Sequence, residues 1–442
     1  MIILFDFFDK KSKDLYYSLI TSGLHGNAVV INDDGFLPQN INSPYSFFCN
    51  MEGKNGNPLY FNQVPLPDLW EIKGNNIEAE IWDFSIKRAK IFYQEPKYKR
   101  QVKNIDWFDN NKKVRYTDHY NRFGWCFART HFDKNQNVTT KSYFDKDGKE
   151  VIVENFRTGV IILNWLNKDY FFDNRVAFLN FYFSLMGWNL SRIWYNSLST
   201  PFFVSYRMTY PGEDILFWQE DIEDTIPANM RVLLESTNTR TQKVIVQKKN
   251  TYHKIKSMLP KEQQEKIGYL GFIHPNKKNN KGRKDIFILT NSDQIEHLEV
   301  LVHHLSDYHF HIAAYTEMSF KLMSFSQEQN VTLYPNISRT DLDNLFEICD
   351  IYFDINHGNE VDDVIRRAFE YNHLIFAFDN TCHNRELVLD SNIISHTTCE
   401  QLINLMKNLS GSIMYLLEQQ REQTSNETKE RYKEILGGYG NA

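Results

Sequence analysis

Residues 350–378 constrain the fold most strongly, because a strand, a turn, a helix and a second strand follow one another there. The run CDIYFDI ends at a turn over residues 356–358, a helical pattern covers 361–371, and the apolar run LIFAF occupies 374–378. This order predicts a βαβ unit of a parallel sheet. Ligands usually bind such sheets at the first turn, so the residues after Ile355 are candidate functional residues.

The same alternation of apolar strand runs and helical patterns covers residues 1–55 and 175–259 and resumes at 285. It predicts an α/β protein with two Rossmann-like domains. The chain has 442 residues, enough for about three domain-sized units. The expected domains are an N-terminal domain of residues 1–76 and 173–265, an insertion of residues 77–172, and a C-terminal domain of residues 266–442, whose last helix could pack back on the N-terminal domain.

The insertion loses the helical period and carries short alternating strands instead. Three segments repeat an aromatic pair, an aspartate, a polar turn and a β-branched return: WFDNNKKV at 107–114, HFDKNQNV at 131–138 and YFDKDGKEV at 143–151. Each is typical of a β-hairpin, so the insertion is predicted to be an antiparallel β-meander. A meander has exposed edges and two faces, which is compatible either with a structural appendage or with a protein-docking surface.

Charge and cysteine content exclude several classes of function. The net charge is −6, which argues against a nucleic-acid binder. No apolar run is long enough to cross a bilayer, and the N-terminal run is interrupted by Asp6, which predicts a first strand rather than a signal peptide. The cysteines form an odd, scattered set that indicates free thiols in a reducing compartment: Cys49, Cys126, Cys349, Cys382 and Cys399.

Three polar groups of residues could suggest further sites, and for each the simpler interpretation is favoured. Asp33 and Asp34 predict an Asx turn after a strand rather than a metal site, because no third ligand is near in sequence. The basic segment 277–284, KKNNKGRK, predicts a solvated loop, with an acidic partner or an anionic membrane as the alternative. A cluster of histidines lacks metal-ligand spacing: His303, His304, His309 and His311.

The βαβ segment resembles the donor site of retaining glycosyltransferases with the GT-B fold. In that family two glutamates eight positions apart serve the donor sugar and ribose, and the helix N-terminus faces the diphosphate. An ungapped register places Asn359 and Arg367 at the two glutamate positions, so the donor site is expected to be degenerate. A slipped register keeps the spacing with Asp362 and Glu370. The family's diphosphate-holding Arg and Lys have no counterpart in residues 290–297, TNSDQIEH, where His297 is the one basic residue.

The whole chain also resembles the GtfB family, the glycosyltransferase-stabilising subunits of the accessory Sec system in Gram-positive bacteria. The resemblance rests on the following motifs: NDDGFLP at 32–38, SPY at 43–45, PLYFNQV at 58–64, TDHY at 117–120, YNSLSTPF at 195–202, DILFWQ at 214–219 and DINHG at 354–358. The resemblance implies a cytoplasmic, non-catalytic GT-B subunit without a cofactor or metal, with at most peripheral contact to the membrane. It also implies that the insertion docks a catalytic partner, GtfA, in a hetero-oligomer that is expected to be a heterotetramer. GtfA transfers N-acetylglucosamine from UDP-GlcNAc to Ser/Thr of serine-rich repeat adhesins before export.

Under this interpretation no residue is catalytic, and the cleft between the α/β domains holds the Ser-rich acceptor or its attached sugar. The expected acceptor-binding residues are His357, Gly358, Asn359 and Glu360. An equally supported interpretation is that they only begin the helix, with Asn359 as its N-cap. Two other functions remain open. One is an active retaining GT-B glycosyltransferase that uses Asp362 and Glu370, and the other is a sugar- or peptide-binding module without an enzyme partner.

Overall fold

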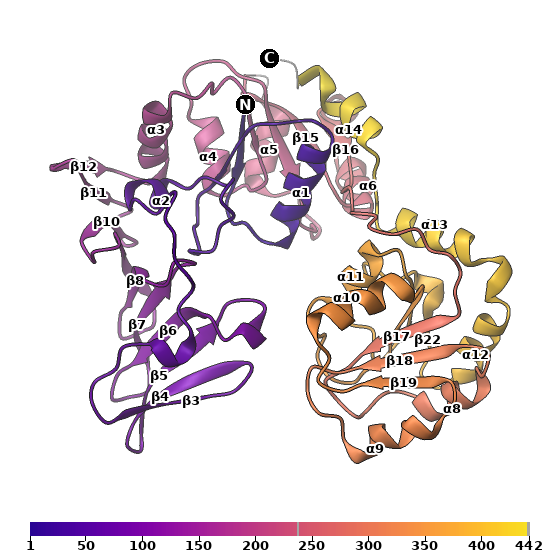
Figure 1. Cartoon of the computed structure of the whole chain (residues 1–442). Coiled ribbons are helices and arrows are strands. Elements are labelled where there is room, and N and C mark those ends of the chain that lie inside the picture. Colours follow the sequence, from indigo (N-terminus) through magenta and orange to yellow (C-terminus); the bar gives the residue numbers. More distant parts are fainter. Residues whose placement is uncertain (237, 440–442) are drawn as a thin grey trace. The chain divides into compact units, whose positions relative to one another are not determined.

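The computed structural model describes residues 1–236 and 238–439 (Figure 1). The chain divides into a first unit, residues 1–270 together with the segment from residue 429 onward, and a second unit, residues 271–428. Each unit contains a six-stranded sheet whose paired strands are parallel, and the first unit also contains a ten-stranded antiparallel sheet. The predicted α/β class is therefore confirmed.

The parallel sheet of the first unit has the strand order β16-β15-β14-β13-β1-β2. Its strands are short and almost entirely buried, which explains their continuous apolar sequences. The strands are β1 (Ile2–Phe5), β2 (Asn27–Val30), β13 (Ile193–Tyr195), β14 (Asp214–Trp218), β15 (Thr241–Val246) and β16 (Ile267–Tyr269). The helices are α1 (Lys10–Thr21), α2 (Pro44–Phe48), α3 (Arg175–Met186), α4 (Thr200–Tyr206), α5 (Ala228–Glu235), α6 (Lys249–Met258), α7 (Lys261–Gln264) and α14 (Lys429–Leu436), the last of which contacts α1.

The ten-stranded sheet is a meander in which each strand pairs with its neighbours in sequence. It begins at Trp70, before residue 77, where the hairpin pattern was expected to start. Its strands are β3 (Trp70–Gly74), β4 (Glu78–Asp83), β5 (Ile86–Tyr93), β6 (Val102–Phe108), β7 (Val114–Tyr120), β8 (Cys126–Phe132), β9 (Val138–Phe144), β10 (Glu150–Asn155), β11 (Ile161–Trp165) and β12 (Lys168–Phe172).

The three predicted hairpins are confirmed, and the repeated aspartate explains them. In each turn the aspartate Oδ1 accepts the backbone N–H of the second and fourth following residues, at 2.8–3.0 Å. The aspartates are Asp109, Asp133 and Asp145. A carboxylate that satisfies two turn N–H groups fixes the loop length, and the loop length fixes the strand register.

The ten-stranded sheet shares its core with the α/β part of the first unit. Tyr45 stacks on Tyr143 of β9, with ring centroids 4.2 Å apart. At the same junction the buried carboxylate of Glu154, on β10, forms an ion pair with Arg175 at the start of α3. Because apolar packing and a buried ion pair both cross this junction, the sheet is not an appendage joined only by its two chain connections.

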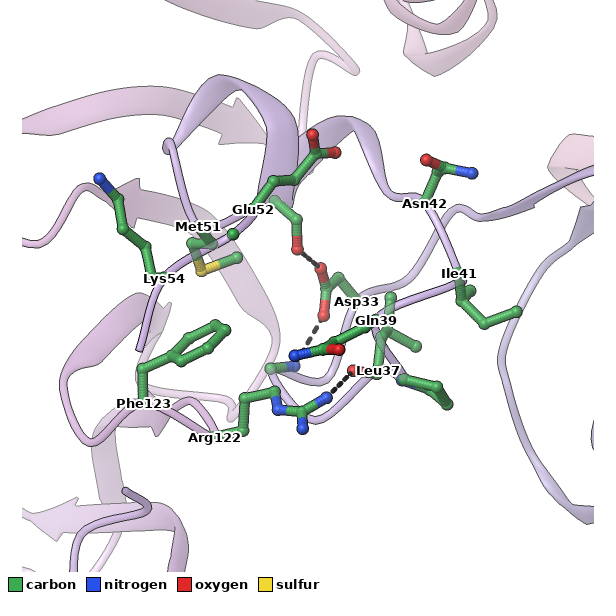
Figure 2. A pocket seen from close by; sticks show the side chains of 14 residues that line it. Asp33, Leu37, Gln39, Ile41, Asn42, Met51, Glu52, Lys54, Arg122 and Phe123 are labelled. Atoms are coloured by element: carbon green, nitrogen blue, oxygen red, sulfur yellow. Dashed lines mark hydrogen bonds between the residues drawn. The ribbon is translucent and has the colours of Figure 1, made fainter. Parts of the chain in front are cut away.

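The loop after β2 contacts the turn between β7 and β8. Residues of this loop and of this turn line a pocket of about 350 Å³ (Figure 2). Gly35 has a left-handed backbone, with φ of +83°, and a Cβ there would lie 2.6 Å from the Phe127 ring. The Gly35 carbonyl accepts the Arg122 N–H at 2.8 Å. The Asx turn predicted at Asp33 is confirmed, because its Oδ1 accepts the Gly35 N–H at 2.7 Å.

The second unit has the strand order β19-β18-β17-β20-β21-β22, with apolar clusters on both faces of the sheet. Its strands are β17 (Asp285–Leu289), β18 (His309–Ala313), β19 (Val331–Tyr334), β20 (Ile351–Asp354), β21 (Leu374–Phe378) and β22 (Ile393–Ile394). Its helices are α8 (Leu298–His304), α9 (Phe320–Met323), α10 (Arg339–Ile348), α11 (Val364–Glu370), α12 (Cys399–Lys407) and α13 (Ile413–Gln423). The four clustered histidines lie on α8 and β18. No helix of the residues described here is long and apolar enough to cross a membrane.

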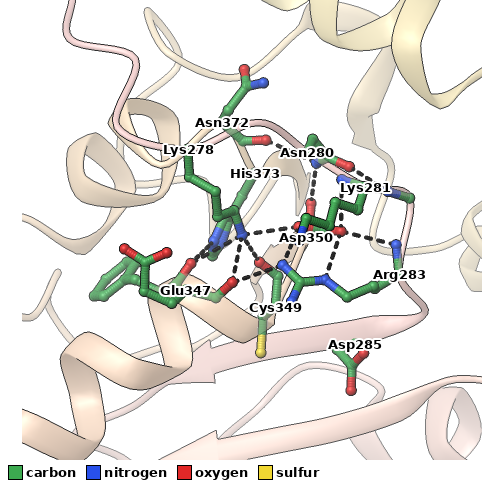
Figure 3. Close-up of polar contacts among 12 residues, drawn as sticks. Lys278, Asn280, Lys281, Arg283, Asp285, Glu347, Cys349, Asp350, Asn372 and His373 are labelled. Carbon is green, nitrogen blue, oxygen red and sulfur yellow. Dashed lines mark hydrogen bonds and ion pairs between the residues drawn. The ribbon is translucent and has the colours of Figure 1, made fainter.

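The basic segment 277–284 is a loop with five of its eight residues exposed, as predicted, but Asn280 is buried and Lys278 and Arg283 are half-buried. Asp350, fully buried before β20, forms ion pairs with Lys278 at 2.9 Å and with Arg283 at 2.9 Å (Figure 3). The backbone N–H groups of Lys281 and Arg283 donate to the same carboxylate, and the Asn280 amide donates to the Asp350 carbonyl at 2.8 Å. Two of the five basic side chains of the segment, Lys278 and Arg283, thus neutralise a buried acid.

Candidate functional site

The candidate site lies where the carboxyl ends of β17 and β20 meet in the second unit. β17 pairs with β18 on one side and β20 on the other, so the strand order reverses between β17 and β20, the usual ligand position in such sheets. Three polar side chains are hydrogen-bonded to one another at this position. The Thr290 hydroxyl donates to Asn356 Oδ1 at 2.7 Å, and Asn356 Nδ2 donates to Asn291 Oδ1 at 3.2 Å.

The turn after β20 is bound tightly to the same asparagines. The Gly358 N–H donates to Asn356 Oδ1 at 3.1 Å, and Asn291 Nδ2 donates to the Asn359 carbonyl at 3.2 Å. A Cβ at residue 358 would collide with Asn291 Oδ1, so a larger residue there would displace the Asn291 amide from the turn. The asparagines thus hold the turn itself, and Asn291 stands in the segment where the active family places its diphosphate-holding cations.

His357 points to the surface and is held by a carboxylate of its own unit. Its Nε2 lies 2.6 Å from Glu296 Oε2, which also accepts the Asn380 amide at 2.9 Å. The His357 N–H donates to the Gln294 carbonyl at 3.0 Å. His357 and Asn359 are exposed, whereas Gly358 and Glu360 are half-buried.

The helix after the turn begins later than the sequence pattern predicted. Asp362 and Asp363 both have left-handed backbones, with φ of 51° and 52°, which a right-handed helix cannot include. The helix α11 therefore starts at Val364, and the N-cap predicted at Asn359 is wrong. Instead Glu360 Oε1 accepts the N–H of Ile365 at 3.2 Å. A carboxylate of the chain therefore occupies the helix start, which in the active family faces an anionic diphosphate.

Arg367, which was predicted to stand at the second glutamate position, forms ion pairs with two aspartates of its own unit. Its Nη2 lies 2.6 Å from Asp343 Oδ1 and its Nη1 lies 3.4 Å from Asp362 Oδ2. The guanidinium also stacks over Phe346, 4.1 Å from the ring centroid. Tyr315 donates a further hydrogen bond to Asp362 at 2.8 Å. The cation closes the gap between α10 and α11.

The carboxylates of the slipped register are also used internally. Asp362 is held by Arg367 and Tyr315, as described above. Glu370 ends α11, is 9% exposed, and forms ion pairs with Arg366 at 2.9 Å and Lys277 at 2.7 Å. Two carboxylates that are neutralised by neighbouring side chains offer little free charge to a donor sugar or a ribose.

A histidine that the sequence did not reveal completes the site. His383 Nδ1 lies 2.6 Å from Asp354 Oδ1 at the end of β20, and its Nε2 lies 2.6 Å from the Gly358 carbonyl. Both neighbours are acceptors, so both ring nitrogens must donate and the imidazole is a cation. The Asp354 carboxylate raises the pKa of His383 to about 9. The only sequence signal was an Asp and a His after two neighbouring strands.

The His383 cation should make the turn dependent on pH. Because its pKa is higher in the folded chain than the ordinary value of about 6.5, its stabilising effect is complete below pH 6.5 and is lost as pH rises through 9. Hydrogen exchange of residues 354–360, corrected for the intrinsic rate, should therefore speed up several-fold between pH 7 and 10. H383Q should remove this step. A turn that exchanges equally at both pH values would contradict the assignment of the charge.

Comparisons with known proteins cover nearly the whole chain. Four family models match: the GtfB N-terminal domain over residues 2–48, the GtfB middle domain over 70–173, the GtfB third domain over 175–258 and the GftB/GlyA-F C-terminal domain over 286–423. The UDP-N-acetylglucosamine–peptide N-acetylglucosaminyltransferase stabilizing protein GtfB of Streptococcus parasanguinis is 49% identical over 409 residues, which is 92% of this chain and 93% of that protein.

Two solved structures are similar along the full length. A chain of the GtfA/B complex bound to UDP and GlcNAc superposes with a TM-score of 0.93 at 38% identity, covering 99% of both chains. The pneumococcal O-GlcNAc transferase GtfA in complex with UDP and GlcNAc superposes with a TM-score of 0.51 at 11% identity, again over 99% of both chains. The second likeness shows a shared fold alone.

Proposed function

The chain belongs to the GtfB family of glycosyltransferase-stabilising proteins, and from this premise we propose that it is the non-catalytic subunit of a peptide N-acetylglucosaminyltransferase. The expected GT-B fold is confirmed by the match to the GtfA/B complex. In the proposed role the chain binds and stabilises a catalytic partner of the GtfA type, in a hetero-oligomer that we expect to be a heterotetramer. The partner transfers N-acetylglucosamine from UDP-GlcNAc to Ser/Thr of an adhesin in the cytoplasm.

The observation that carries the proposal is the internally satisfied turn after β20. Glu360 occupies the helix start, Arg367 is paired with Asp343 and Asp362, and Asn291 binds the turn backbone. Removing one charge-stabilising group typically costs about 10²–10³ in rate, so a site without any of them would be a very poor catalyst. In this proposal the chain keeps the strand–turn–helix backbone of a donor site, and the partner supplies the catalytic groups.

We keep a role in acceptor binding for the same turn, in a narrower form. His357 and Asn359 are its exposed side chains and could contact a Ser-rich peptide directly. Gly358 and Glu360 would act by shaping the turn, since the first permits the approach of Asn291 and the second holds the start of α11.

The ten-stranded sheet is the proposed docking surface for the partner. Large apolar side chains are exposed at both ends of its strand order, which is unusual for a surface that stays in water. They are Leu69, Ile77, Phe84 and Ile86 near β3–β5, and Phe156, Ile162, Leu166 and Phe171 near β10–β12. The docking segment would accordingly run from residue 70 rather than 77.

A transfer assay tests the proposed function directly. The purified chain, the partner, and both together are incubated with UDP-GlcNAc and a Ser/Thr-rich acceptor peptide. We expect no transfer by this chain alone, and more transfer by the pair than by the partner alone. Transfer by the chain alone that disappears in a folded E370Q or D362N variant would overturn the proposal in favour of an active enzyme.

A further inference from the structure

The pocket of the first unit is separate from the turn after β20 and has its own set of polar groups. One wall is the loop over residues 33–54, and the other is the β7–β8 turn with Arg122 and Phe123. Its volume, about 350 Å³, is in the range of pockets that hold small organic groups. An occupant would touch both the α/β part and the ten-stranded sheet.

The lining of this pocket balances positive and negative charge. The lining includes two acidic residues, Asp33 and Glu52, and two basic ones, Lys54 and Arg122, so its formal charge is zero. Asp33 is already bound by Ser46 and by the Gly35 N–H. Figure 2 shows Lys54 pointing away from Asp33. A lining of this kind gives no net attraction to an anion or to a cation, so it favours a neutral ligand.

Several polar groups of the lining have capacity for a ligand. Glu52 and Gln39 are exposed at the rim of the pocket, and neither has a side-chain hydrogen bond or ion pair to the described part of the chain. Arg122 donates one hydrogen bond from Nη1 to the Leu37 carbonyl at 2.9 Å, which leaves its other N–H groups available. Partial desolvation raises the pKa of Glu52, although the residue is exposed. The pocket therefore offers both acceptors and donors.

Apolar side chains supply the rest of the surface. Phe123, Met51 and Leu37 line the pocket, and Phe123 is stacked on Trp125 with ring centroids 5.4 Å apart, which fixes its orientation. A fixed aromatic face beside a carboxylate, an amide and a guanidinium suits a group that carries hydroxyls on a C–H framework. Neither a phosphate nor a purely apolar ligand would use this combination.

We propose that this pocket binds a neutral, hydroxyl-bearing ligand, with Glu52 and Gln39 as hydrogen-bonding groups and Phe123 as the packing face. The proposal rests on the proposed function, because a subunit that binds the acceptor meets hydroxyl groups from two sources. These are the hydroxyls of a Ser/Thr-rich peptide and the hydroxyls of a pyranose ring. The pocket would then give the acceptor a contact in the first unit, independent of the turn after β20.

Methyl resonances of methionine provide a local readout of binding. In the full chain labelled with [¹³C-methyl]methionine, the Met51 methyl group lies in the pocket wall, whereas Met258 lies on α6 outside it. The chain is titrated separately with an unglycosylated Ser/Thr-repeat peptide, with the same peptide carrying alanine at every Ser and Thr, and with free N-acetylglucosamine. We expect Met51 to shift with the first or the third probe, and neither methionine to shift with the alanine peptide.

Variants decide whether the named residues are responsible. E52A and F123A should each weaken binding of the active probe by about tenfold or more, because each removes a major contact. E235A, which removes an exposed carboxylate on α5, should leave affinity unchanged. No Met51 shift with either hydroxyl probe, or variants that bind like the wild type, would overturn this proposal. If those variants still assemble with the partner and support transfer, the proposed function would survive its failure.

Discussion

Replacing Asp350 by asparagine should lower the free energy of unfolding of the second unit by about 3–5 kcal/mol. Asp350 is 0% exposed and Lys278 is 7% exposed, so the substitution leaves a buried ammonium without its counter-charge. The neutral amide also weakens the hydrogen bonds from the Arg283 side chain and from two backbone N–H groups. Losing one partner of a buried pair costs far more than the pair contributes, because the remaining charge stays desolvated.

The effect of D350N should also depend on pH. Burial alone would raise the pKa of Asp350, but the hydrogen bonds from Arg283 and Lys278 outweigh burial and hold the pKa well below its ordinary value of 3.8. A lowered pKa means that the carboxylate stabilises the fold above pH 3.8 and that this contribution is lost as pH falls below it. The difference in stability between wild type and D350N should therefore be constant near neutrality and shrink in acid.

The distribution of tryptophan makes this prediction measurable unit by unit. All eight tryptophans lie between Trp70 and Trp218, in the first unit, so tryptophan fluorescence reports the first unit alone. Unfolding in urea is monitored by hydrogen exchange of peptides from residues 271–428 and, separately, by tryptophan fluorescence. In D350N the midpoint seen by hydrogen exchange should move to lower urea concentration, while the midpoint seen by fluorescence should not change. D307N, at an exposed surface pair with Lys284, is the matched control and should change stability by less than about 0.5 kcal/mol. If the second unit of D350N unfolded at the same urea concentration as that of D307N, the proposed stabilisation by Asp350 would be contradicted.

Local chemistry explains which parts of the fold were predictable. The aspartates of the hairpins act on backbone groups only two and four residues away, so their pattern can be read from the sequence. Buried parallel strands such as β14 and β21 are continuous apolar runs, bounded by polar residues, for the same reason. Asn359 and Arg367 were assigned as degenerate donor positions from the resemblance to the glycosyltransferase motif, and that assignment stays a prediction.

Contacts between residues distant in sequence explain what was missed. The ion pairs of Lys278 and Arg283 were missed because their acid, Asp350, lies about 70 residues further along the chain. His383 is 29 residues from Asp354, and no periodicity links them. The late start of α11 comes from left-handed backbones at Asp362 and Asp363, and the side chain of Asp362 is held by Tyr315, which is far from it in sequence, and by Arg367 of α11. Side chains that only meet in the folded sheet leave little trace in a sequence pattern.

The internal core of the ten-stranded sheet changes how its docking role should be tested. Deleting the sheet would remove the packing of Tyr143 on Tyr45 and the partner of Arg175, so the first unit would be damaged together with any docking surface. Substitutions on exposed positions avoid this problem. Ile162 and Phe171 are Cα partners on neighbouring strands, so lysine at one and aspartate at the other place opposite charges across the pair and preserve the sheet.

We expect at least one of two double variants to weaken binding to the GtfA-type partner by about 30-fold or more. The first is I162K/F171D, and the second is F84D/I86K at the other end of the sheet, where Phe84 is 77% exposed in a tight turn. Each replaces an apolar anchor with charges that an interface would have to desolvate. Affinity is measured by biolayer interferometry with the partner immobilised, and the melting temperature of each variant is measured alongside.

The control places the same kind of change on the other unit. Phe320, on α9, is 91% exposed, so F320D tests whether any new surface charge disturbs the complex. If the ten-stranded sheet carries the docking surface, F320D binds like the wild type while a sheet variant does not, and all three variants melt near the wild-type temperature. If both sheet variants bind normally and F320D does not, the partner docks on the second unit. The exposed aromatic side chains of the sheet would then be a contact surface for a molecule other than this partner.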